Sequence, residues 1–139
     1  QWETDLIGYN AMKSYGSPSY YAQVMFASYL GDHTLGSELK GAGPKFFYSI
    51  TENTAKKQLY LKLVNASSTP QAVDIDLAGA MLAKTAKLVS LNAHDTEATN
   101  TIDDPERIVP VDSTLNDVSS QFHHTLPGYS IQVIEFNEE

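Results

Sequence analysis

The stretch Ser14–Leu30, SYGSPSYYAQVMFASYL, predicts the helix around which the rest of the fold is arranged. Ser17 can accept a capping hydrogen bond from a free backbone N–H group, and Pro18 suits the first turn, where no backbone donor is needed. Gly31 stands where a left-handed C-terminal cap is expected. The sequence therefore indicates both the start and the end of this helix.

One face of the predicted helix carries the residues that we expect to be buried. At helical spacing this face comprises Tyr21, Val24, Met25, Ser28 and Tyr29. A single helix cannot bury such a face by itself, so the sequence requires a larger layer for it to pack against.

Composition limits the size of the core and the class of partner. The 139 residues suffice for one sandwich with an appendage, and the net charge of −8 disfavours nucleic acid and anionic membranes as partners. The absence of cysteine excludes disulfides and thiolate metal sites. The sequence does not decide whether the protein is cytoplasmic or secreted, and we expect a bacterial source. The start at Gln1, without Met or a signal-like segment, suggests a piece of a longer chain.

The residues before the helix predict a strand followed by a loop. In Gln1–Ile7, QWETDLI, the apolar residues Trp2 and Leu6 stand among polar neighbours, which is typical of a short strand. Gly8–Gly16 is expected to be a loop. After the helix, the glycine-rich stretch Asp32–Pro44 predicts an irregular linker.

From Lys45 onward apolar and polar residues alternate, a pattern that indicates strands. The clearest pair is Phe46–Thr51 with Gln58–Val64, joined by a polar turn. Further strands are expected at residues 73–77, 86–91, 122–126 and 129–136, with a long polar crossing at 92–110. About seven short strands predict a mainly β protein built as an antiparallel β-sandwich.

Glu3 and Asp5 are the first candidates for chemistry, because side chains two apart on a strand share a face and could act as acid and base. The carboxylates of a retaining glycosidase, however, stand about 5 to 5.5 Å apart and normally come from different strands. A solvated pair is therefore the favoured interpretation.

The histidines do not form a metal site in the sequence. His123 and His124 are adjacent on a predicted strand and should point to opposite faces, while His33 and His94 each neighbour an aspartate but lack a third ligand. We therefore expect no metal and no cofactor. No G-x-S-x-G elbow or glycine-rich phosphate loop supports a serine hydrolase or a nucleotide site.

Aromatic residues are the remaining candidates, since sugar rings stack on aromatic faces. Aromatics at helical spacing are more often core residues, so Trp2 is the stronger sugar-binding candidate among them. Asn65-Ala66-Ser67 is a glycosylation sequon in a predicted turn, which matters only in a eukaryotic secretory setting.

Residues 1–26, QWETDLIGYNAMKSYGSPSYYAQVMF, resemble the end of the catalytic barrel in α-L-arabinofuranosidases of glycoside hydrolase family 51. In that family a W-x-x-D-L-I strand leads into a helix that begins S-P-S-Y-Y. The later segments FFYSIT, LYLKLVNASSTPQAV, ATNTIDDPERIVP and LPGYSIQVIEF follow in the same order as in the family's C-terminal sandwich. The resemblance therefore covers essentially the whole chain.

The resemblance implies a (β/α)8 barrel followed by a jelly-roll-like sandwich. Residues 1–37 would be the last β/α unit of the barrel and residues 38–139 the C-terminal sandwich, which is expected to borrow strands from the missing N-terminus. The implied reaction is retaining hydrolysis of terminal α-L-arabinofuranosyl groups from arabinan- or arabinoxylan-type polysaccharides by two glutamates. Both glutamates would lie upstream of Gln1, which leaves no catalytic residue in this chain. Trp2, Thr4 and Asp5 could then help to line the sugar subsite.

The implied partners are the rest of the catalytic barrel and an arabinose-containing polysaccharide or oligosaccharide, with a homo-oligomer left open. Two roles compete for the sandwich itself: a structural brace for the barrel or a non-catalytic carbohydrate-binding module. The brace is favoured because the predicted sandwich strands show no evident aromatic platform.

Overall fold

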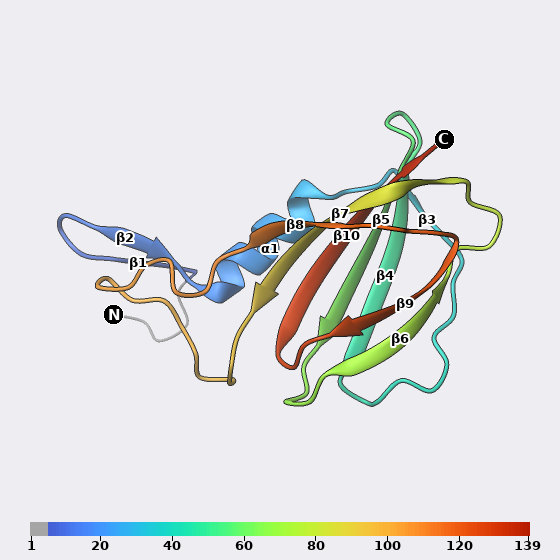
Figure 1. The fold of residues 1–139 in the computed structure, drawn as a ribbon. Helices are drawn as coiled ribbons and strands as arrows, with labels where there is room; N and C mark the ends of the chain where they lie inside the picture. Colours follow the sequence, from blue (N-terminus) through green and yellow to red (C-terminus); the bar gives the residue numbers. More distant parts are fainter. Residues whose placement is uncertain (1–5) are drawn as a thin grey trace.

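The computed structural model describes residues 6–139. It consists mainly of antiparallel strands with one helix, as the sequence predicts (Figure 1). In chain order the elements are β1 (Ile7–Tyr9), β2 (Ser14–Gly16), α1 (Pro18–Ser28), β3 (His33–Thr34), β4 (Phe46–Asn53), β5 (Gln58–Asn65), β6 (Gln71–Asp76), β7 (Leu82–Asn92), β8 (Val111–Leu115), β9 (Gln121–Leu126) and β10 (Ser130–Glu138).

The main sheet has six strands in the order β3-β4-β5-β10-β7-β8, and a separate pair, β6-β9, packs against one of its faces. Helix α1 packs against the opposite face (Figure 1). The main sheet is therefore covered unequally, by a short two-stranded sheet on one side and by a single helix on the other.

The core between the two sheets is built from the alternating residues of the central strands. Leu59, Leu61 and Leu63 of β5 point into this core, as do Ile134 and Phe136 of β10. Alternation places every second side chain of a strand on the same face, so the leucine pattern of β5 specifies which face is buried.

A second core lies between α1 and the main sheet. Its buried members are Met25, Val89, Leu91, Ile108 and Val133. Because α1 covers this face, the central parts of β5 and β10 are buried on both faces and lack the water-exposed outer face usual for an antiparallel sheet.

Helix α1 begins where the sequence predicts but ends earlier. Ser17 Oγ accepts a hydrogen bond from the backbone N–H of Tyr20 at 3.2 Å. The helix ends at Ser28, and the described glycines with positive φ are Gly41 and Gly79, so the expected left-handed cap at Gly31 is wrong. A Cβ atom at Gly31 would lie 2.4 Å from the carbonyl oxygen of Glu52. Glycine is needed there because the chain passes against β4.

The buried face of α1 is rotated relative to the predicted one. Met25 is buried, with Tyr21, Ala22, Phe26 and Tyr29 packed around it. Val24 is 42% exposed and Ser28 is exposed, so the prediction was wrong for these two residues. Apolar side chains occur on several sides of this helix, so spacing alone did not fix which side meets the sheet.

Three irregular regions of the sequence prediction contain strands. The stretch 8–16, expected to be a loop, pairs with itself as the β1–β2 hairpin. The expected linker Asp32–Pro44 contains β3, which pairs with β4. Strand β8 was not predicted, because its sequence VDSTL has three polar residues in a row; four of its five residues are exposed in the structure. The expected strand Gln1–Ile7 lies outside the described residues except for its last two positions, of which Ile7 begins β1.

Candidate functional site

The β1–β2 hairpin forms an arm, residues 7–16, that projects from one end of the molecule (Figure 1). Its turn is closed by Asn10, whose Oδ1 accepts hydrogen bonds from the backbone N–H groups of Met12 at 2.9 Å and Lys13 at 2.8 Å. On the stem, Gly8 stands opposite Tyr15, and a Cβ atom at Gly8 would lie 2.2 Å from the Tyr15 ring. The tyrosine therefore lies directly on the glycine backbone.

Asn100 fastens the base of this arm to the polar crossing segment. Its side chain is fully buried; Nδ2 donates to the carbonyl oxygens of Gly16 at 2.8 Å and Ile108 at 2.9 Å. Its Oδ1 accepts from the N–H of Ile108 at 2.7 Å. Figure 1 shows the crossing segment running beside the arm. Sequence reasoning missed this anchor, because Asn100 stands in a polar stretch with no pattern that distinguishes it.

Lys62 joins the main sheet to the last turn of α1. Its Nζ donates to the carbonyl oxygen of Phe26 at 3.0 Å and lies 5.4 Å from the centre of the Phe26 ring. Burial lowers the pKa of the Lys62 ammonium. A cation suits this position, because the carbonyl groups at the C-terminal end of a helix carry partial negative charge.

Aromatic contacts continue this seam from Lys62 toward the edge strand. Tyr29 meets Tyr60 edge to face with ring centres 5.8 Å apart, and burial raises the pKa of Tyr60. The Lys87 ammonium lies 5.7 Å from the Tyr29 ring and 2.9 Å from Asp112. The hydrogen bond to Asp112 is the main cause that raises the pKa of Lys87. The helix is thus held by cations as well as by apolar packing.

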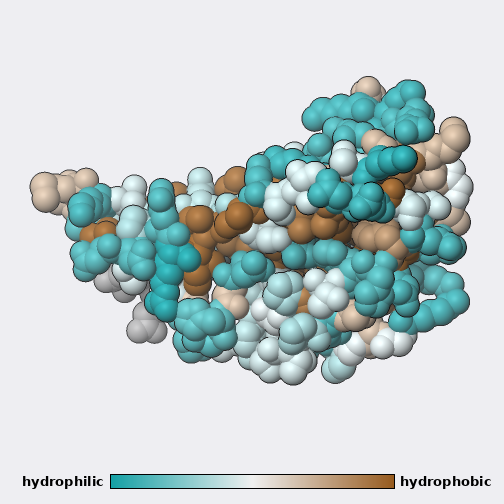
Figure 2. Space-filling view, viewed as in Figure 1, coloured by the Kyte–Doolittle hydropathy of each residue, from teal (hydrophilic) through white to brown (hydrophobic). Residues whose placement is uncertain are grey.

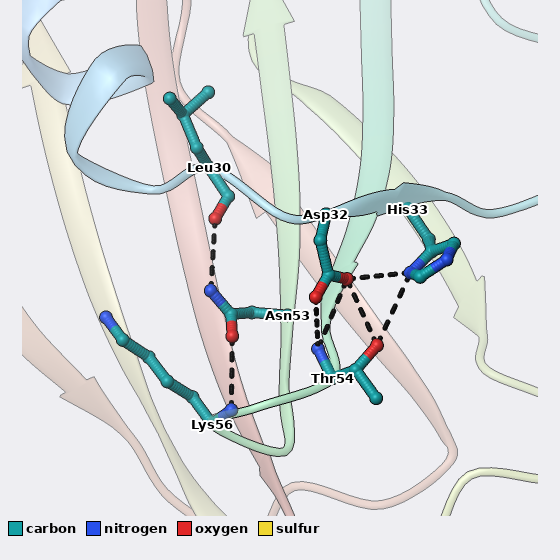
Figure 3. A network of polar contacts seen from close by, with 6 residues as sticks. All are labelled: Leu30, Asp32, His33, Asn53, Thr54 and Lys56. Atoms are coloured by element: carbon teal, nitrogen blue, oxygen red, sulfur yellow. Dashed lines mark hydrogen bonds and ion pairs between the residues drawn. The ribbon is translucent and has the colours of Figure 1, made fainter.

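A polar network holds the segment after α1 against the β4–β5 turn (Figure 3). The Asp32 carboxylate accepts from Thr54 through its N–H at 3.3 Å and its Oγ1 at 3.1 Å, and lies 2.7 Å from His33 Nδ1. Beside it, Asn53 Nδ2 donates to the carbonyl oxygen of Leu30 at 3.4 Å. The hydrogen bonds of the Asp32 carboxylate, first with His33 and then with Thr54, lower the pKa of Asp32.

The other three histidines each contact one or two polar side chains, and His94 Nε2 lies 3.2 Å from its neighbour Asp95 and 3.1 Å from Arg107. His123 Nδ1 lies 2.8 Å from Asp74, and His124 Nε2 lies 2.7 Å from Gln132 Oε1, so the two point to opposite faces as predicted. Within residues 6–139 no group of three or more His, Cys, Asp or Glu side chains could hold a metal ion. In the same range no helix is long and apolar enough to cross a membrane.

The side chain of Asn65, the first residue of the glycosylation sequon, is buried and hydrogen-bonded. Asn65 is 1% exposed, and its Nδ2 donates to the carbonyl oxygens of Thr69 and Pro127, both at 2.9 Å. Its Oδ1 accepts from the N–H and hydroxyl of Ser67. The side chain therefore organises the turn and cannot carry a glycan in this fold.

An open groove of about 940 Å³ lies between the two sheets. Its lining is mixed: apolar side chains such as Phe46, Leu61 and Val73 form one part, and polar side chains such as Glu52 and Asp74 form another. The segment 35–42 borders the groove on its other side. The two-stranded sheet is thus too narrow to close the sandwich over β4 and β5.

The predicted sugar-subsite residues Trp2, Thr4 and Asp5, together with Glu3, lie outside the described residues. Their roles stay predictions. What the structure does define is a class of domain: an antiparallel β-sandwich backed by a helix, with an arm at the helix N-terminus and polar groups that serve mainly to hold segments together.

Comparison with known proteins identifies the family. Residues 2–130 match the sequence model of the alpha-L-arabinofuranosidase C-terminal domain. Alpha-L-arabinofuranosidase A of Aspergillus kawachii is 31% identical over 99% of this chain and 21% of its own length, and alpha-L-arabinofuranosidase 1 of Arabidopsis thaliana is 27% identical over 100% of this chain and 21% of its own. An arabinose-bound α-L-arabinofuranosidase of glycoside hydrolase family 51 has the same fold, with TM-score 0.92 and 31% identity over 100% of this chain and 22% of that one.

The chain therefore belongs to the C-terminal domain family of the family 51 α-L-arabinofuranosidases. It spans about a fifth of the length of the curated relatives that it matches.

Proposed function

We propose that this chain is the C-terminal part of a retaining α-L-arabinofuranosidase that removes terminal arabinofuranosyl groups from arabinan- or arabinoxylan-type polysaccharides. The match of residues 2–130 to the family carries the proposal, and the likeness to an arabinose-bound enzyme supports it. Retaining hydrolysis uses two carboxyl groups about 5 to 5.5 Å apart, one as nucleophile and one as acid and base. In this proposal both belong to the barrel upstream of the chain.

The chemistry of the described residues supports a structural role for this part. A general acid needs a carboxyl group with a raised pKa, whereas hydrogen bonds lower the pKa of Asp32. The carboxylate oxygens of Asp32 also form hydrogen bonds with Thr54 and His33, and these bonds hold the chain after α1 against the β4–β5 turn. We expect the 139-residue chain alone to be inactive.

Helix α1 is suited to lie between two partners, which supports a barrel as the missing one. One side meets the main sheet through Met25 and Phe26, while Val24 and Ala27 on another side are exposed. A helix with apolar residues on several sides is typically buried on more than one. In this proposal residues 1–37 complete the barrel, and residues 38–139 form the sandwich that braces it.

The groove between the sheets fits the expectation that the sandwich takes strands from the N-terminal part of the complete protein. Part of its lining is apolar, with residues such as Leu61 and Val73, and β6 pairs only with β9 among the described strands. An extended segment placed there would satisfy the free edge of β6 and cover these apolar residues.

The test is hydrolysis of an aryl α-L-arabinofuranoside by the complete protein, with the configuration of the released arabinose followed by NMR. We expect release with retained configuration. An inverted product or no release would contradict the proposal. Affinity electrophoresis of the 139-residue chain on arabinan and arabinoxylan tests the carbohydrate-binding alternative, because a binding module is retarded and a brace is not.

A further inference from the structure

The arm exposes apolar side chains that nothing in the described structure covers. Tyr9 is 78% exposed, Met12 is 89% exposed and Ile7 is 48% exposed. Ile7 and Tyr9 are two apart on β1, so their side chains share one face of the arm. Figure 2 shows a small, weakly hydrophobic patch at the tip of the arm, at the left edge of the view, beside hydrophilic residues.

These side chains stand on a fixed support. Asn10 closes the turn with two hydrogen bonds, Tyr15 packs on the backbone of Gly8, and buried Asn100 anchors Gly16 at the base. A short two-stranded hairpin is marginally stable by itself, so this set of contacts gives the arm a defined shape. Apolar groups held rigidly in water bind with little loss of conformational entropy.

The arm lies at the N-terminal end of α1, because β2 ends at Gly16 and Ser17 caps the helix. In a (β/α)8 barrel every helix begins at the face where the active site is built. If α1 is the last helix of the barrel, an assignment that rests on the proposed function, the arm stands at the rim of the catalytic face.

We propose that the arm is a polysaccharide contact outside the arabinosyl subsite, with the Tyr9 ring stacked on a sugar of the polymer and Met12 packed beside it. The C–H faces of a neutral sugar match an exposed aromatic ring, and recognition of this kind needs no charge. A separate protein partner fits less well, since a standard protein interface buries about 800 Å² per side, whereas the large exposed apolar side chains of the arm are only Ile7, Tyr9 and Met12.

The experiment compares the Tyr9→Ala variant of the complete protein with the unmodified protein on two substrates, an aryl α-L-arabinofuranoside and arabinoxylan. The aryl substrate reaches only the arabinosyl subsite, so its KM and kcat should not change. The KM for arabinoxylan should rise about threefold to tenfold. Phe47→Ala is the matched control, because Phe47 is an aromatic residue of β4 with 57% exposure outside the arm. Retardation on an arabinoxylan gel gives a second readout that does not depend on turnover.

Each outcome decides between the alternatives. Selective loss on arabinoxylan in Tyr9→Ala, but not in Phe47→Ala, supports the contact. Unchanged KM and retardation overturn it, as does an equal loss on both substrates with a lower melting temperature, which would mean that the arm docks on the barrel. If the unmodified protein fails on the aryl substrate, the proposed function fails, while gel retardation still tests the arm.

Discussion

The side-chain amide of Asn100 donates to the carbonyl oxygen of Gly16 at 2.8 Å, across 84 positions of the sequence. This bond joins the end of the arm to the crossing segment. The same side chain also donates to the carbonyl oxygen of Ile108 and accepts from the N–H of Ile108. This buried amide therefore fastens the base of the arm to the crossing segment.

Replacing Asn100 with Ala should destabilise the protein by about 2–3 kcal/mol, because the buried N–H of Ile108 and the carbonyl of Gly16 lose their partners. Amide hydrogen exchange in the arm should accelerate more than exchange in β5. Urea unfolding and hydrogen exchange measure the two effects. Unchanged exchange in the arm would show that Asn100 does not hold it.

The rotation of α1 predicts a contrast between neighbouring residues. Met25→Ala removes a side chain that is 2% exposed and should cost about 2–4 kcal/mol of unfolding free energy. In the isolated 139-residue chain, Val24→Ala is the matched control and should cost less than about 0.5 kcal/mol, because Val24 is exposed there. Thermal or urea unfolding of the isolated chain measures both values, and a larger loss for Val24→Ala than for Met25→Ala would mean that the other face of the helix meets the main sheet.

Gly31 is predicted to be intolerant of a side chain. Gly31→Ala would place a Cβ atom 2.4 Å from the Glu52 carbonyl oxygen, and relief of this clash should cost about 1–3 kcal/mol. Gly36 has open space around its Cα, so Gly36→Ala should be close to neutral. Equal melting temperatures for the two variants would contradict the close approach of the chain to β4.

The Asp32 network predicts a pH dependence. Because the folded protein lowers the pKa of Asp32 below its ordinary value of 3.8, the unfolded state binds the proton first as pH falls. The stabilisation is present above that ordinary pKa and is lost as pH falls through the lowered folded pKa. The Asp32→Asn variant should therefore be less stable than the unmodified protein near neutral pH, and the two free energies of unfolding should approach each other below about pH 4. Melting temperatures of both proteins between neutral and acidic pH measure this effect. A difference in melting temperature that does not change with pH would show that the charge of the Asp32 carboxylate does not stabilise the fold.

The sequence predicted the strands well where one physical signal dominated. The Leu59, Leu61 and Leu63 alternation specified β5 and its buried face, and Ser17 with Pro18 specified the helix start. It failed where the signal depends on tertiary contacts. Nothing local shows that Gly31 serves a close approach to β4 or that the polar β8 pairs with β7.

For the candidate site, too, the features that depend on local geometry could be predicted and those that depend on tertiary contacts could not. Opposite directions for His123 and His124 follow from strand geometry, so they could be predicted. The anchor at Asn100 and the buried Lys62 could not, because each owes its role to a segment distant in sequence. An exposed Tyr9 likewise gains meaning only from the hairpin that holds it.

The central claim is that this chain is the non-catalytic C-terminal part of an α-L-arabinofuranosidase. The most direct measurement is aryl α-L-arabinofuranoside hydrolysis by the purified 139-residue chain beside the complete protein at equal concentration. We predict turnover by the complete protein and none by the chain alone. Robust turnover by the chain alone would contradict the account.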